Sequence, residues 1–159
     1  MVGGAARDDG ASEAEGLMEA ANSALLAMVE AGHIEPSEYR HMTIPTWNRT
    51  TAEYVEPFES GEFEGTLELR RHAPRWLPDR YFEAYTSDGD LDRYTESVTG
   101  FFRGAFGDSL WASLDTHRDQ AARAAVAERF DALLRERIAA DPEAAACRWH
   151  VVVFDIARP

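Results

Sequence analysis

Apolar residues recur every three or four positions over much of the 159-residue chain, which is the spacing of one face of an α-helix. The pattern predicts four longer helices, over residues 12–31, 50–60, 91–106 and 117–140. Ser12 and Thr50 each stand three positions before a glutamate, as in a capping box that starts a helix. Pro36 and Pro78 are expected in the first turns of two short helices, where proline is favoured. The chain is therefore predicted to be mostly helical.

Two stretches have the patterns of β-strands. Apolar residues alternate with mostly polar ones over residues 63–69, which predicts a strand with one buried face. The continuous apolar run of residues 149–156, WHVVVFDI, predicts a second strand that is covered on both faces. Because two strands do not form a stable sheet by themselves, we expect further strands from an N-terminal half, a partner chain or the second copy of a homodimer.

The first residues differ in composition from the rest of the chain. Residues 1–11 are small, glycine-rich and acidic, and include the pair Asp8 and Asp9. This composition predicts a flexible tail, so that the folded part is residues 12–159. The stretch SDGDLD, residues 87–92, resembles part of a calcium loop but lacks the later glutamate of that loop. We interpret it as a turn that caps the next helix.

Charge limits the partners that the chain is expected to have. The formal net charge is −13, which argues against nucleic acids and anionic membrane surfaces as partners. Against this background, Arg70, Arg71, His72 and Arg75 form a basic cluster. We interpret the cluster as a solvated face, with an acid-binding role as the alternative.

Several classes of chemistry are excluded or unsupported by the residues. No apolar run reaches the roughly 18 residues of a membrane span, and the start has no signal-peptide core, so we expect a soluble, cytoplasmic protein. The single cysteine, Cys147, excludes an internal disulfide and a cysteine-based zinc site, and is interpreted as a small core residue. The five histidines lack metal-ligand spacing, and no glycine-rich loop joins a predicted strand to a helix. No metal site is predicted.

Large aromatic residues are the remaining candidates for a binding site. Trp47, Tyr94, Trp111 and Trp149 lie on separate predicted elements. Aromatic residues at helical spacing are usually part of a core. Trp47 differs because it lies in an extended, proline-containing segment where no helix face requires it. It is therefore predicted to line a pocket.

Five segments, in order, resemble the carboxyl methyltransferases of the salicylate and jasmonate type, the SABATH family, in a bacterial version. LMEAANSALLAMVEAGHI is similar to the family's "LNDSLxDLVxEGLI", and MTIPTWNRTTAEYV is similar to "FNxPxYxPSxEEV". GEFEGTLEL is similar to "EGSFEIxxLE", and YTESVTGFFRGAFGDSLWASL to "MRAVxEPLLxxHFGxxIxxxLF". WHVVVFDIAR is similar to the closing strand "FxNLVVSLTR". Together the segments cover nearly all of the chain after residue 16.

The resemblance implies a fold and an activity. The family has a Rossmann-like sheet that binds S-adenosyl-L-methionine (SAM) and a helical cap over the substrate. This chain would be an α/β C-terminal half: the cap and the last two, antiparallel strands, with the N-terminal half missing. The family transfers a methyl group from SAM to a carboxylate, or a related oxygen or nitrogen, of a small and often aromatic molecule. A carboxylate is already ionised at neutral pH, so the protein mainly holds it in line with the methyl group in an apolar pocket.

The resemblance also implies site residues. Trp47 falls on the pocket-lining Tyr of "PxYxPS", and Trp149 on the aromatic residue that opens the last strand. Tyr94 and Ser97 fall on the Met and the Val of "MRAV", which contact the substrate. Thr95 stands where the family has the Arg of that motif, and the two larger aromatics, Trp47 and Tyr94, would reshape a salicylate-sized pocket.

The family's SAM-binding glycine motif, its ribose-binding acid and the Gln and Trp that grip the carboxylate lie upstream of the matched segments and are absent from this sequence. No catalytic or cofactor-binding residue is therefore assigned, and the chain is not expected to bind SAM by itself. The alternatives are a non-enzymatic subunit that binds a small molecule or a partner, and the product of a non-functional gene fragment.

Overall fold

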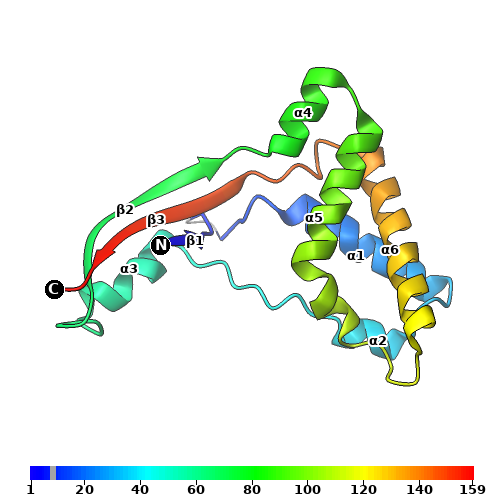
Figure 1. Ribbon diagram of the computed structural model, residues 1–159, viewed down its shortest axis with the longest axis horizontal. Helices are drawn as coiled ribbons and strands as arrows, with labels where there is room; N and C mark the ends of the chain where they lie inside the picture. Colours follow the sequence, from blue (N-terminus) through cyan, green and yellow to red (C-terminus); the bar gives the residue numbers. More distant parts are fainter. Residues whose placement is uncertain (8–9) are drawn as a thin grey trace. The chain divides into compact units, whose positions relative to one another are not determined.

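The computed structural model describes residues 1–7 and 10–159, which form six α-helices and one three-stranded antiparallel sheet (Figure 1). The chain divides into two compact units. The sheet unit comprises Met1–Glu15, Trp47–Asp79 and Cys147–Pro159. The helical unit comprises Gly16–Thr46 and Arg80–Ala146. The expectation of an α/β chain with an antiparallel strand pair is confirmed, and the strands described here include no parallel pair.

The sheet has the strand order β1-β3-β2, with β3 in the centre (Figure 1). Its strands are β1 (Val2–Gly4), β2 (Glu68–Leu77) and β3 (Trp149–Ala157). Val153 of β3 lies opposite Val2 on one side and Ala73 on the other. The apolar run that predicted a strand at the end of the chain therefore occupies the centre of the sheet.

The prediction of a flexible tail over residues 1–11 is wrong for Val2–Gly4, which form β1. Met1 and Phe154 exchange two backbone hydrogen bonds, of 3.0 and 2.8 Å. The tail lacks an apolar pattern, but backbone pairing with an apolar strand does not require one. Gly3 also lies so close to Tyr54 that a β-carbon there would be 2.9 Å from the tyrosine ring. The pair Asp8 and Asp9 lies outside the described residues.

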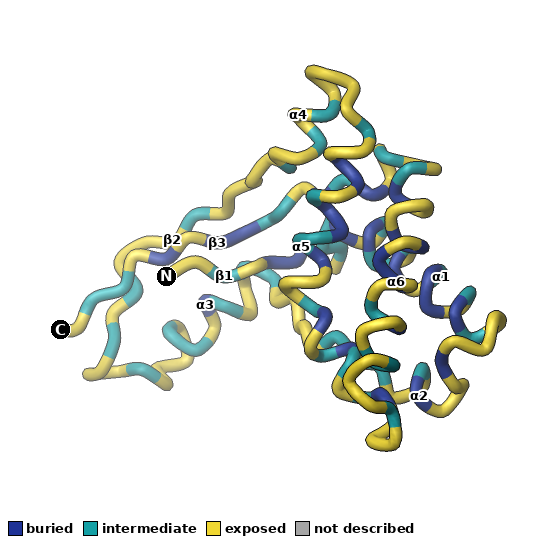
Figure 2. Tube along the Cα trace, turned by 45° about the vertical axis from the view of Figure 1, so that its right-hand side comes forward, coloured by how far each residue is buried: buried dark blue, intermediate teal, exposed yellow. Residues whose placement is uncertain are grey.

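The strand predicted over residues 63–69 is placed too early, since β2 begins at Glu68. Residues 61–66 form turns instead, with positive φ angles of 82° at Gly61 and 73° at Gly65. Glycine adopts this left-handed backbone without steric cost, so turn geometry overrides the short alternation of apolar residues. The basic cluster belongs to β2, and its four side chains are exposed, as expected for a solvated face (Figure 2).

One face of β3 is fully covered and the other only in part, where Val151 is 8% exposed, whereas the sequence predicted that both would be covered. Val152 and Phe154 are 0% and 4% exposed, and they cluster with Val55 of α3 (Thr51–Glu59). On the opposite face Val153 is 40% exposed, and Asp155 is exposed as well. One helix covers one face of a small sheet, so the other face of β3 is open to solvent at Val153 and Asp155.

The outer edge of β2 carries a proline at a position that suits it. Phe154 directs its backbone groups toward β1, so Val153 directs its own toward β2 and pairs with Ala73. The next residue, Pro74, therefore faces away from β3, where its missing N–H removes no bond of the ladder. Proline and exposed arginines at an edge also discourage pairing with other chains.

The predicted helices are present, but the predicted end of the helix over residues 91–106 is wrong, because α5 continues through Gly107 to Trp111. The helical unit contains α2 (Pro36–His41), α4 (Arg80–Asp88), α5 (Leu91–Trp111), α6 (Gln120–Ala140) and all but the first residue of α1 (Glu15–Glu30). Asp90 caps α5 by accepting a hydrogen bond of 3.0 Å from the Arg93 amide, which confirms the capping role predicted for residues 87–92. The capping box of Thr50 and Glu53 at α3 is confirmed too.

The core of the helical unit is aromatic and aliphatic. Phe102, Phe130 and Leu134 are at most 1% exposed, and Trp111 meets the ring of Phe130 edge-on at 5.3 Å. No helix within the described residues is long and apolar enough to cross a membrane.

Candidate functional site

The four residues predicted to contact a substrate are divided between the two units. Trp47 and Trp149 belong to the sheet unit, and Tyr94 and Ser97 belong to α5 in the helical unit. Trp47 is 80% exposed and lies on an extended segment before α3. Trp149 opens β3 and is half-buried. The structure thus brings Tyr94 and Ser97 together on one helix, and the proposed contact of all four with one substrate stays a prediction.

Tyr94 is held inside the helical unit by its neighbours. It is 2% exposed, its hydroxyl donates to the Pro142 carbonyl at 3.1 Å, and its ring stacks on Tyr85 at 5.2 Å. Ser97, one turn further along α5, is half-buried. These contacts make Tyr94 a part of the core, whatever else it touches.

A cavity of about 470 Å³ lies in the helical unit, and none of the four predicted residues lines it. Its walls come from α1, α2, the segment that follows α2, and α5. The apolar lining residues are Met18, Ala21, Leu25, Met42, Ile44, Phe102 and Leu110. Pockets for small molecules have this kind of lining and volumes of roughly 300–1,000 Å³. We call this space the helical-unit cavity.

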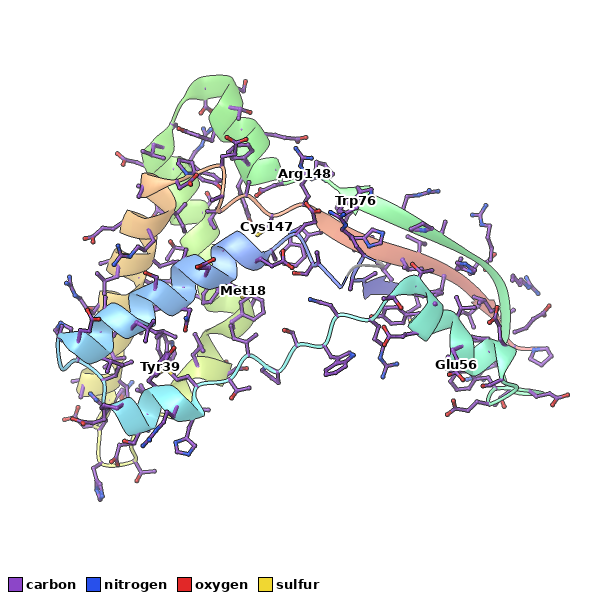
Figure 3. All side chains as sticks on the ribbon, turned by 180° about the vertical axis from the view of Figure 1, so that it is seen from behind. Met18, Tyr39, Glu56, Trp76, Cys147 and Arg148 are labelled. Atoms are coloured by element: carbon purple, nitrogen blue, oxygen red, sulfur yellow. The ribbon has the colours of Figure 1, made fainter. Side chains whose placement is uncertain are left out.

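Three polar residues complete the lining of the helical-unit cavity: Asn22 on α1, and Tyr39 and Arg40 on α2. Figure 3 labels Met18 and Tyr39 on these two helices. The Tyr39 hydroxyl donates a hydrogen bond of 2.7 Å to the Asn22 side-chain oxygen. Arg40 is exposed, so it lies where the cavity meets solvent, and no described carboxylate forms an ion pair with it. A mostly apolar cavity whose rim holds a guanidinium that pairs with no described carboxylate suits a small apolar molecule that carries a carboxylate.

α2 owes its position to a buried carboxylate. Glu38 is 5% exposed and accepts hydrogen bonds from the Nε and Nη2 atoms of Arg118, both at 2.6 Å. The amides of Asp115 and Glu35 donate to the same carboxylate, each at 2.8 Å. The Arg118 guanidinium, helped by these amides, lowers the pKa of Glu38 to about 2 against the effect of burial.

Sequence reasoning missed Arg40, Tyr39 and Glu38. Arg40 and Tyr39 stand in a helix of six residues, too short for a periodic signal. Glu38 and Arg118 are 80 positions apart, so no local motif joins them. The one available signal was the capping box of Glu35 and Glu38, which indicates where α2 begins but not what Glu38 binds.

A second, larger groove of about 810 Å³ lies in the sheet unit, between α3, the turn after it and β2. Apolar residues such as Phe58 and Leu69 line it together with acidic and basic side chains, among them Glu64, Glu68 and Arg71. Because its charges are of both signs, the groove favours no ligand charge. The helical-unit cavity is the better candidate for a site.

The cysteine and the metal-ligating side chains are further candidates for a site. Burial raises the pKa of the Cys147 thiol to about 12, so it stays protonated, in keeping with its interpretation as a core residue. No cluster of three or more metal-ligating side chains occurs in the part of the chain that the structure describes.

No protein-family model matches the chain, and no curated protein matches its sequence.

Proposed function

We propose that this chain is the substrate-binding portion of a SAM-dependent methyltransferase of the SABATH type, acting on the carboxylate, or a related oxygen or nitrogen, of a small apolar molecule. The helical-unit cavity carries the proposal, because it combines apolar walls with the cation of Arg40, which pairs with no carboxylate among the described residues. The order of the five similar segments supports the methyltransferase part. A Rossmann-like sheet would come from an N-terminal half or a partner chain.

The role of this chain would be to bind and orient. The apolar walls, such as Phe102 and Leu110, would exclude water from the body of the ligand, and Arg40 would attract its carboxylate. SAM supplies the methyl group when it is bound. The residues that bind SAM in the family are absent from this sequence, and β2 runs into α4 through Pro78 and Asp79 with no glycine-rich loop. SAM would therefore be bound by the other half.

The test is calorimetric titration of the full chain with benzoate and phenylacetate, and with their methyl esters. We expect both acids to bind and the esters to bind at least about tenfold more weakly, since only the acids can form a charge-assisted hydrogen bond. Arg40→Gln is expected to remove most of the difference between acid and ester. Arg129→Gln, which removes an exposed arginine of α6 outside the cavity lining, serves as the control.

Two results would contradict the proposed binding site, and a third would contradict the assignment to the family. One is the absence of acid binding by the wild-type chain. The other is an equal response of the Arg40→Gln and Arg129→Gln variants, which would mean that net charge rather than the cavity attracts the acid. Tight binding of SAM by this chain would contradict its assignment to the half without the cofactor site.

A second candidate is a non-enzymatic subunit that binds a small carboxylic acid. The cavity favours it as well, because binding needs no cofactor. The DNA on both sides of the coding region distinguishes the two candidates, since the enzyme requires a SAM-binding half in frame or in a neighbouring gene. Co-expression of that half with this chain should then yield methyl ester from SAM and the acid. Acid binding without ester formation would favour the binding subunit.

A further inference from the structure

α2 is the helix of the helical-unit cavity that depends most on contacts with other segments. It has only six residues, and isolated helices shorter than about 12 residues are marginal in water. It nevertheless supplies Tyr39 and Arg40, two of the three polar lining residues, and leads directly into Met42. The shape of the cavity and the place of its cation therefore depend on whatever fixes α2.

Glu38 is the residue through which other segments of the chain hold α2. Arg118, which precedes α6, binds both carboxylate oxygens, and Asp115, which follows α5, donates its amide. The same guanidinium donates from Nη2 to the carbonyl of His33, just after α1, at 3.1 Å. The carboxylate of Glu38 thus binds the loop between α5 and α6 directly, and through Arg118 it is linked to the segment that follows α1. Glu38 and Arg118 are 5% and 22% exposed at their side chains, so water competes little for this ion pair.

The hydrogen bond that α2 makes on its cavity side is weaker than the Glu38–Arg118 pair. The hydrogen bond from Tyr39 to Asn22 joins two neutral groups. A charge-assisted, bidentate arginine–carboxylate pair is roughly twice as strong per bond and fixes orientation as well as distance. The ion pair behind α2, rather than the contact inside the cavity, therefore determines where the helix lies.

We propose that Glu38 and Arg118 are positioning residues for the helical-unit cavity. Their bidentate pair holds α2 so that Arg40 stays at the rim and Tyr39 at the wall, and this sets the affinity for a small apolar carboxylate. The proposal rests on the function proposed above for the cavity. Neither residue lines the cavity, so both act through α2.

A matched pair elsewhere in the helical unit provides the control. Arg103 of α5 forms an ion pair with Asp131 of α6, in which the Asp131 side chain is 12% exposed and the Arg103 side chain 57% exposed. Neither of its residues lines the cavity or belongs to α2. Weakening the control pair should change the stability of the unit without changing the position of α2.

The experiment compares the full chain with Arg118→Lys, Glu38→Gln and, as the control, Arg103→Lys. Lysine keeps the charge but not the bidentate geometry, and glutamine keeps the size, so both cavity variants are expected to fold. Hydrogen exchange without ligand is followed at the amides of Tyr39 and Met42, which are bonded to Glu35 and Tyr39. We expect these amides to exchange at least tenfold faster in the two cavity variants than in the wild-type chain, and we expect unchanged exchange throughout α2 in the control.

The second measurement is the Kd for benzoate of each variant. It is expected to rise about tenfold in Arg118→Lys and Glu38→Gln and to stay unchanged in Arg103→Lys. Faster exchange in α2 with an unchanged Kd would overturn the proposal, as would an equal rise in the control. If the wild-type chain binds no acid, the proposed function fails, but the exchange data still decide whether the ion pair positions α2. Unchanged exchange of the α2 amides in Arg118→Lys overturns the positioning role, and faster exchange of these amides in Arg118→Lys but not in Arg103→Lys supports it.

Discussion

The two units handle apolar surface in different ways. The helical unit buries its largest side chains almost completely, including Tyr94, Phe102 and Phe130. The sheet unit holds most of the large apolar side chains that are exposed: of the eight described, six belong to it, namely Met1, Val2, Trp47, Trp76, Leu77 and Val153. Helices can surround a shared core, whereas a sheet has two faces and α3 covers only one. The helical unit therefore resembles a complete domain core, and the sheet unit retains surface for further contacts.

The largest expected effect tests this contrast in the cores. Phe130→Ala removes a side chain that is 1% exposed and packs against Phe102 and Trp111, so it should lower the free energy of unfolding by about 3–5 kcal/mol. Val153→Thr, at a 40% exposed position of the open sheet face, should change it by no more than about 0.5 kcal/mol. Urea denaturation followed by circular dichroism measures both. Similar losses for the two variants would refute the contrast.

Acid should weaken the helical unit through Glu38. Its pKa falls from an ordinary 4.5 to about 2 on folding, so its contribution is complete above about pH 5 and is lost as the pH falls toward 2. The shift corresponds to about 3 kcal/mol. The difference in unfolding free energy between wild type and Glu38→Gln should therefore shrink by about that amount between pH 6 and pH 2, in denaturation curves measured at both pH values.

The sheet unit provides the comparison for this acid effect. Hydrogen bonds from Thr50 lower the pKa of Glu53 as well, but Glu53 is exposed and its contribution is screened by water. Glu53→Gln should therefore show a much weaker dependence on pH than Glu38→Gln. An equal dependence would mean that burial of the Glu38 network has no special effect.

The smallest expected effect concerns the edge of the sheet. Pro74→Ala restores an N–H that faces away from β3, so the unfolding free energy should change by less than about 1 kcal/mol, mainly through the flexibility of the unfolded chain. Ala73→Pro, one residue earlier, removes an N–H that faces Val153 and should cost about 3 kcal/mol or more. Thermal denaturation of both variants checks the register. Equal costs would mean that β2 is paired one residue out of the described register.

Local sequence signals predicted the helices well because the signals act within a few residues. Thr50 with Glu53, and Asp90 ahead of α5, cap their helices through hydrogen bonds that span three positions. Gly32 follows α1 with a φ of 71°, as a terminating glycine should. Strands depend on partners, and prediction succeeded only for β3: β1 has no apolar pattern, and β2 begins only after the turns that contain Gly61 and Gly65.

The candidate site was less predictable than the fold. Trp47 was predicted to line a pocket because it lies outside any helix. In the structure it is exposed and lines neither described cavity. Arg40 matters because α1, α2 and α5 meet around it, and such a meeting leaves no mark in a short stretch of sequence.

The sequence by itself determined which segments are helical and where several of them are capped, that the last strand is apolar, and that the chain is strongly acidic. These properties depend on the residues themselves or on neighbours within one or two turns. Only the tertiary structure decided that residues 2–4 join the sheet, that one face of β3 stays partly open, and that Glu38 and Arg118 form a buried pair behind α2. Each of these depends on segments far apart in the chain, whose contacts form only when the whole unit folds.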